Sequence, residues 1–288
     1  MLNKQTRKDA MEVIMINDCS PNTNCEYQNL IQEFSDLNIK YLKTESNSGP
    51  GVARQLGLDN CDSPWVLFHD DDDTLNHPYV IEQFLEVIEN CENRKGILNS
   101  ICGRHLLGSN LTGGFTGNLF NLNLIKYFNL SFDPSLSSFE EDTYFLLQFQ
   151  YHTRRLNSFY PCYLVDLETL ENSKYITYTK KINNYSICSI LQNEERILKS
   201  LRYLDKVCYF YLSLPRDKIL EATLKEHFTD LIIYLNDLLK GYIEIKNASD
   251  EYFSLIEHIN SQLIELYKYC PCVKEEILLE YLDLVSQI

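Results

Sequence analysis

Residues Asp70–Asp73 are four consecutive carboxylates that follow the short apolar run Trp65–Phe68, with His69 between them. A short apolar run bounded in this way is typical of a buried strand. The carboxylates then lie at the carboxyl end of that strand, which is where open α/β sheets bind ligands. Carboxylate oxygens suit hard cations such as Mg²⁺ and Mn²⁺. The pattern therefore predicts a metal site, and the alternative is a solvated acidic loop.

A second acid, Asp18, ends the predicted strand at residues 12–16. Because parallel strands end at the same edge of a sheet, we expect Asp18 to lie near the acidic run. Its carboxylate could accept hydrogen bonds from a base or a sugar. The alternative is an Asx-type turn made by Asp18 with Ser20.

Gly49-Pro50-Gly51 precedes a predicted helix that carries Arg54. Backbone N–H groups and a guanidinium at a helix start suit a diphosphate. The segment is not a P-loop, because no Gly-Lys-Ser/Thr follows. The alternative is an ordinary glycine-containing loop.

Ser138 and Glu141 match a capping box and predict a helix start at this point. Asp142 would lie in the first turn, where the helix dipole and free N–H groups favour its ionised form. An ionised carboxylate held in place suits a general base. The alternative for Asp142 is a helix-capping acid, a role that Glu140 and Glu141 could also fill.

Strands and helices alternate through the first part of the chain. The expected strands are residues 12–16, 39–42 and 65–68, and the expected helices are about 25–34, 53–58 and 78–90. This alternation implies right-handed crossovers and a mostly parallel sheet, hence an α/β fold. Further on we expect a strand at 97–102, a short helix at 119–128 and strand-like pieces within 158–180.

Glycine becomes scarce after about residue 186, where helical periodicity predicts several helices. We therefore expect an α/β domain over residues 1–185 and an all-α module over 186–288. The helical module could support oligomerisation.

Composition excludes several classes of partner. The chain has 288 residues, a 44% hydrophobic fraction and a formal net charge of −15. This charge argues against general nucleic-acid binding and against docking on anionic lipid. A phosphate-bearing substrate would need a local cation.

Ten scattered cysteines, without a CxxC pair or a secretion signal, indicate reduced thiols and a cytoplasmic location. No apolar stretch is long enough for a transmembrane segment.

Four segments, taken in order, resemble glycosyltransferase family 2. They are Glu-Val-Ile-Met-Ile-Asn-Asp-Cys-Ser, Asn-Ser-Gly-Pro-Gly-Val-Ala-Arg-Gln-Leu-Gly, Phe-His-Asp-Asp-Asp-Asp-Thr-Leu and Phe-Glu-Glu-Asp-Thr-Tyr-Phe. The similarity covers roughly residues 4 to 186. It implies a GT-A fold and a nucleotide-diphosphate sugar as donor, with a UDP-sugar foremost.

The resemblance also implies roles for individual residues. In the donor site, Asp18 would contact the nucleotide base, Asp70 the ribose and Asp72 the metal, with Asp73 sharing the metal. Nucleotide-sugar contacts are further expected from Gly49, Arg54, Asp71 and Lys180, with Lys181 as the alternative to Lys180. Two exposed lysines are the plainer interpretation of that last pair.

The resemblance makes Asp142 the catalytic base of an inverting transfer. Asp142 would take the proton of the acceptor hydroxyl as that oxygen attacks the anomeric carbon from the face opposite the leaving group. Mn²⁺ or Mg²⁺ would stabilise the departing nucleoside diphosphate. The acceptor, whether a glycan, a lipid-linked molecule or a protein, is not specified by the sequence.

The start of the chain departs from the family pattern. Residues 5–9 resemble the end of the family's first helix, and the strand before that helix is missing. We therefore expect marginal stability and weak or absent transfer. Two alternatives follow: an inactive nucleotide-sugar-binding or assembly module, and a haloacid-dehalogenase-type phosphatase. The phosphatase would use Asp70, Asp72, Thr74 and Leu75, with Asp70 as nucleophile.

Overall fold

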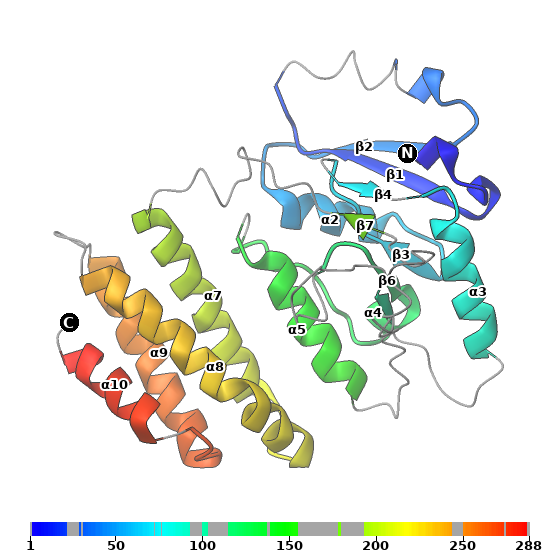
Figure 1. The fold of residues 1–288 in the computed structure, drawn as a ribbon. Coiled ribbons are helices and arrows are strands. Elements are labelled where there is room, and N and C mark those ends of the chain that lie inside the picture. The colour runs from blue at the N-terminus through cyan, green and yellow to red at the C-terminus, as the bar shows by residue number, and fades with distance from the viewer. Residues whose placement is uncertain are drawn as a thin grey trace. The chain divides into compact units, whose positions relative to one another are not determined.

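The computed structural model describes residues 2–21, 29, 31–71, 73–75, 77–92, 100–102, 115–136, 139–154, 178–179, 193–243, 250–273 and 275–286. The chain divides into two compact units, residues 1–184 and 185–288. The described strands belong to the first unit, and the described part of the second unit is helical (Figure 1).

The first unit contains a pair of parallel strands. β1 (Glu12–Asn17) pairs with β2 (Asn38–Lys43), so that Glu12 lies opposite Asn38. Helix α2 (Pro50–Asp59) packs against β1. The approach is close, because a Cβ added at Gly57 would lie 2.8 Å from Ile16 Cδ1. The predicted strands at 12–16 and 39–42 are confirmed, as is their parallel direction.

The strand that precedes the acidic run belongs to a second, antiparallel sheet. β6 (Asn118–Asn121) lies between β3 (Trp65–Leu67) and β5 (Ser100–Cys102) and runs antiparallel to both. The predicted helix at 119–128 is therefore wrong in its first residues, and α4 (Leu122–Tyr127) begins after the strand. The strand is favoured because residues 119 and 120 pair with both β3 and β5. Apolar periodicity alone cannot distinguish so short a strand from a helix.

Two further helices and a strand pair complete the first unit. α3 (Val80–Glu92) follows the acidic run, and α5 (Glu141–Arg154) follows α4. β4 (Thr74–Leu75) and β7 (Tyr178–Thr179) form a short antiparallel pair.

Residues 2–10 form two 3₁₀ turns, η1 (Leu2–Lys4) and η2 (Lys8–Ala10), where the end of an α-helix was expected. Gln5 is buried, and its amide donates to the carbonyl oxygen of His77 at 3.0 Å. The backbone N–H of Thr6 donates to Pro78 O at 2.8 Å. The N-terminal segment is thereby fixed against the residues that lead into α3.

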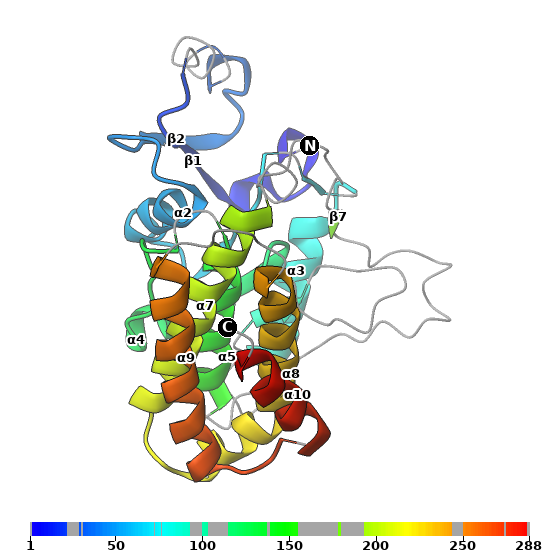
Figure 2. The ribbon, with the colours of Figure 1, turned by 90° about the vertical axis from the view of Figure 1, so that its left-hand side faces the viewer.

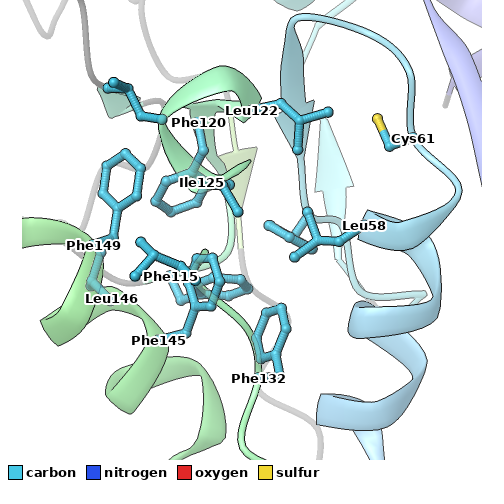
Figure 3. Packing of buried hydrophobic residues seen from close by; sticks show 13 residues of the cluster. Leu58, Cys61, Phe115, Phe120, Leu122, Ile125, Phe132, Phe145, Leu146 and Phe149 are labelled. Atoms are coloured by element: carbon cyan, nitrogen blue, oxygen red, sulfur yellow. The ribbon is translucent and has the colours of Figure 1, made fainter. Parts of the chain in front are cut away.

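A cluster of phenylalanines connects the acidic strand to α5 (Figure 3). Phe68 lies two residues before Asp70, and its ring centroid lies 4.7 Å from that of Phe115 and 6.3 Å from that of Phe145. Phe132 stacks on Phe145 at 4.5 Å. Leu58 of α2 belongs to the same buried cluster. The core therefore fixes the end of β3 relative to α2 and α5.

The second unit contains α7 (Asn193–Ser213), α8 (Lys218–Ile243), α9 (Asp250–Tyr269) and α10 (Glu275–Ser286). α7 packs against α8 and α9, and α8 packs against α10 (Figures 1 and 2). Leucines such as Leu201, Leu220 and Leu239 are fully buried between them. Among the helices that the structure describes, none combines the length and apolar character needed to cross a membrane.

Candidate active site

The acidic run forms a turn at the end of β3. The N–H of Asp73 donates to the carbonyl oxygen of Asp70 at 3.1 Å. Asp70 is partly exposed, Asp71 is exposed and Asp73 is buried. These three carboxylates therefore occupy different environments, whereas the sequence suggested that all four would be aimed at one place. Asp72, the predicted metal ligand, lies outside the described residues.

The chemistry of this turn suits a hard cation, because its ionisable side chains are all carboxylates. Within the described ranges, no group of three His, Cys, Asp or Glu side chains is arranged to hold a metal ion. The predicted site at this turn uses Asp72, with Asp73 as its partner. The assignment of Mn²⁺ or Mg²⁺ to these residues stays a prediction.

Arg54 joins the acidic turn to the start of α5. Its Nη2 lies 3.0 Å from Asp70 Oδ1, and its Nη1 lies 2.6 Å from Glu141 Oε1. The guanidinium also lies 5.3 Å from the centroid of the Phe115 ring, and the side chain is only 13% exposed. Burial opposes the charge, but Asp70, Glu141 and Asp142 together raise the pKa of Arg54. Arg54 is thus a permanent cation held between two carboxylates.

The helix start at α5 differs from the predicted capping box. α5 begins at Glu141 itself, and the preceding Glu140 has a φ of 61°, which is uncommon for a residue other than glycine. The Glu141 side chain is paired with Arg54, a contact that the capping box did not predict. Burial raises the pKa of Glu141, and the nearby charge of Asp142 raises it further. Ser138 lies outside the described residues.

Asp142 lies in the first turn of α5, as predicted. Its Oδ1 accepts hydrogen bonds from the N–H of Thr143 at 2.7 Å and from the Thr143 hydroxyl at 3.3 Å. The residue is partly exposed, in contrast to the buried Glu141 beside it. The two neighbouring acids therefore differ in position, with Glu141 turned inward and Asp142 accessible.

Asp18 holds the loop that precedes α2. Its carboxylate accepts from the N–H groups of Gly49 at 2.7 Å and Ser48 at 3.0 Å, and from the Thr44 hydroxyl at 2.9 Å. The expected Asx-type bond to Ser20 does exist, but it comes from Asn17, whose Oδ1 accepts the Ser20 N–H at 2.9 Å. The predicted Asx-type turn is therefore present, but Asn17 makes it and not Asp18.

The structure brings most of the described candidates to one region. Asp18 fixes Gly49 at the start of α2, and the same helix carries Arg54, which contacts Asp70. Lys180 and Lys181 lie outside the described residues. Sequence reasoning gave Glu141 only a capping role. The sequence did contain a signal for an ion pair, since Glu141 is an acid at the start of an apolar helix. A carboxylate buried there requires a cationic partner.

Comparisons with known proteins agree with this architecture. Residues 2–99 match the model of Glycosyl transferase family 2. The chain is 24% identical to the poly(ribitol-phosphate) beta-N-acetylglucosaminyltransferase TarP of Staphylococcus aureus (strain N315), over 92% of this chain and 88% of TarP.

Solved structures show the same fold. The crystal structure of S. aureus TarS 1-349 in complex with UDP aligns over 99% of this chain and 82% of its own, with a TM-score of 0.67 and 15% identity. The mannosyltransferase PcManGT from Pyrobaculum calidifontis, in complex with GDP-Man and Mn2+, aligns over 98% of this chain and 80% of its own. Its TM-score is 0.51 and its identity is 11%.

The matched residues include β1, α2 and the acidic turn. The segment Asp70–Leu75, on which the phosphatase alternative depended, therefore lies within the glycosyltransferase match. The sequence match over residues 2–99 and the fold together show that the chain resembles glycosyltransferase family 2 and has a GT-A fold.

Proposed function

We propose that this enzyme transfers a sugar from a nucleotide-diphosphate sugar to an acceptor hydroxyl, with inversion and with the assistance of a divalent cation. The observation that carries this proposal is the double ion pair of Arg54, which links the acidic turn to the start of α5. The proposed donor-binding residue Asp70 and the proposed base Asp142 are thereby parts of one site.

The charges at this site support a need for a cation. A sugar diphosphate carries about two negative charges, and the acidic turn alone contributes four carboxylates. Arg54 is already engaged by Asp70 and Glu141, so its charge is largely compensated before a donor binds. A divalent cation on Asp72 and Asp73 would reverse the local sign and stabilise the departing diphosphate. Lys180 is proposed as a further phosphate contact.

Asp142 is proposed as the general base. It is partly exposed, so an acceptor hydroxyl can reach it, and its hydrogen bonds to Thr143 hold the carboxylate in place. As the acceptor oxygen attacks the anomeric carbon, its proton passes to Asp142, and the bond from that carbon to the diphosphate oxygen breaks. One such displacement inverts the configuration at the anomeric carbon.

The nucleotide site is proposed at the carboxyl ends of β1 and β3. Asp18 and Gly49 would contribute the edge that receives the nucleotide, with Asp70 and Asp71 on the side of the acidic turn. Structures similar to this chain are complexes with UDP, UDP-GlcNAc and GDP-Man. We therefore choose UDP-GlcNAc as the first donor to test, and other UDP-sugars as the second.

The cytoplasmic location and an oligomer formed through the C-terminal helices stay predictions. Among the cysteines whose side chains the structure describes, the free thiols are Cys19, Cys61, Cys208, Cys270 and Cys272.

Measurement of UDP release and of the glycosylated product tests the proposal. The chain should release UDP from UDP-GlcNAc, or from another UDP-sugar in a donor panel, when Mn²⁺ and a suitable glycan acceptor are present. The product should have the anomeric configuration opposite to that of the donor. Retention of configuration would contradict the mechanism. Donor binding without any turnover would favour the alternative of a nucleotide-sugar-binding module.

A further inference from the structure

Glu141 occupies an unusual position for an acid at a helix start. Its side chain is 5% exposed, although carboxylates at helix starts usually face solvent and interact with free N–H groups. It is instead directed at Arg54, with 2.6 Å between Oε1 and Nη1. Burial of a charge in this way is costly unless it is paired, so the Arg54 contact is what keeps Glu141 in this place.

The backbone before Glu141 needs such a contact. Glu140 has a left-handed φ of 61°, a conformation that costs free energy in residues with a Cβ. The carbonyl oxygen of Glu140 accepts the N–H of Tyr144 at 2.9 Å, so the strained residue is joined directly to the first turn of α5. Strain of this kind persists only where the surrounding structure fixes it, and the Arg54–Glu141 pair supplies a fixed point one residue later.

The position of Asp142 depends on the Arg54–Glu141 ion pair. It follows Glu141 in the same helical turn, and its own hydrogen bonds go to the adjacent Thr143. Those local bonds orient the carboxylate but do not tie it to the acidic turn. The tie to Asp70 passes through Glu141 and Arg54.

We propose that Glu141 is a positioning residue for sugar transfer, which holds Asp142 at a fixed place relative to the donor site through its ion pair with Arg54. This inference rests on the proposed function, because it presupposes that Asp142 accepts the proton of the acceptor. Small displacements of a catalytic group reduce turnover strongly, by up to roughly a hundredfold for about 1 Å. Loss of the Glu141 charge should therefore act on turnover and leave donor binding nearly unchanged.

The test compares Glu141→Gln, Glu141→Asp and the parent, with kcat and the dissociation constant of UDP measured separately in the presence of Mn²⁺. Glu141→Gln keeps the shape of the side chain and an acceptor oxygen for Arg54, so the fold should survive. We expect kcat to fall by roughly tenfold to a hundredfold, with UDP affinity within about threefold. Glu141→Asp restores the charge and should recover part of the lost turnover.

Glu265→Gln is the matched control, because it makes the same chemical change at an exposed ion pair with Lys268 in α9. It should leave kcat unchanged. If the parent transfers sugar and Glu141→Gln turns over as fast, the positioning role is wrong while the proposed function stands. An equal loss of kcat and UDP affinity would instead show a merely structural role. If Glu141→Gln does not fold, Glu141→Asp is compared with the parent alone: a folded Glu141→Asp variant that has no turnover, although it restores the charge, contradicts the proposal. A parent without turnover on any donor would overturn both proposals.

Discussion

The guanidinium of Arg54 lies 2.6 Å from the carboxylate of Glu141, although the two residues are 87 positions apart in the sequence. The same guanidinium holds Asp70 on its other side. One buried cation thus connects the end of a strand, the middle of one helix and the start of another. The stability of the site and its chemistry should both depend on this residue.

Replacement of Arg54 by methionine should destabilise the protein strongly. The change leaves Glu141 buried without its cation, and loss of one partner from a buried ion pair costs about 3–5 kcal/mol. Urea denaturation should therefore show a free energy of unfolding lower by about 3 kcal/mol. Arg7→Met is the control, because Arg7 pairs with Asp9 at the exposed surface and its loss should barely move the urea midpoint. Equal effects of the two substitutions would contradict the account.

The stability of the parent should depend on the protonation of Glu141. Burial, and then the charge of Asp142, raise the pKa of Glu141 above its ordinary value of 4.5. The folded state therefore binds a proton more tightly than the unfolded state, so protonation of Glu141 stabilises the fold at low pH. This stabilisation is lost as the pH rises through the folded pKa. Urea midpoints measured from pH 4 to 8 should show that the parent loses stability relative to Glu141→Gln as the pH rises. A difference that does not change with pH would show that the carboxylate is not perturbed.

Asp142→Asn should separate chemistry from binding. The amide cannot accept the proton of the acceptor, so sugar transfer should fall by roughly a hundredfold or more. UDP binding should stay close to that of the parent, because Asp142 belongs to the α5 side of the site. Transfer within a few-fold of the parent would exclude Asp142 as the base. A covalent phosphoenzyme at Asp70 would revive the phosphatase alternative.

Gly49→Ala should weaken the loop that Asp18 holds. Gly49 has φ and ψ of 91° and 167°, a backbone region that is almost exclusive to glycine. We expect a loss of about 1–3 kcal/mol in the free energy of unfolding, accompanied by weaker UDP binding. Gly51→Ala is the control, since Gly51 lies within α2 and alanine is the better helix former. A Gly49 variant as stable as the Gly51 variant would mean that the loop tolerates a side chain.

Local patterns predicted much of the architecture, and long-range contacts account for the rest. The strand before Asp70 and the helix start beside Asp142 could be predicted because each depends on neighbouring residues. The ion pair between Arg54 and Glu141 could not be predicted, because no local pattern indicates a contact across 87 positions. The sequence predicts helix over 119–128, but residues 119–121 belong to the strand Asn118–Asn121, whose identity depends on pairing with β3 and β5.

The acidic turn shows the same limit in its details. The sequence predicts Asp70–Asp73 at a strand end, and the described members Asp70, Asp71 and Asp73 lie there. Their different exposure follows from the turn closed between Asp73 and Asp70, and from the engagement of Asp70 by Arg54. Neither contact can be inferred from four identical residues in a row.

The most direct test of the central claim is the affinity of the chain for UDP, measured by calorimetry with Mn²⁺ and again with a chelator, for the parent and for Asp72→Ala. The account predicts that Mn²⁺ tightens UDP binding to the parent by about tenfold or more, equivalent to about 1.4 kcal/mol, and that Asp72→Ala removes most of this gain. Equal UDP affinity with and without Mn²⁺ in the parent would contradict a metal-assisted donor site at the acidic turn.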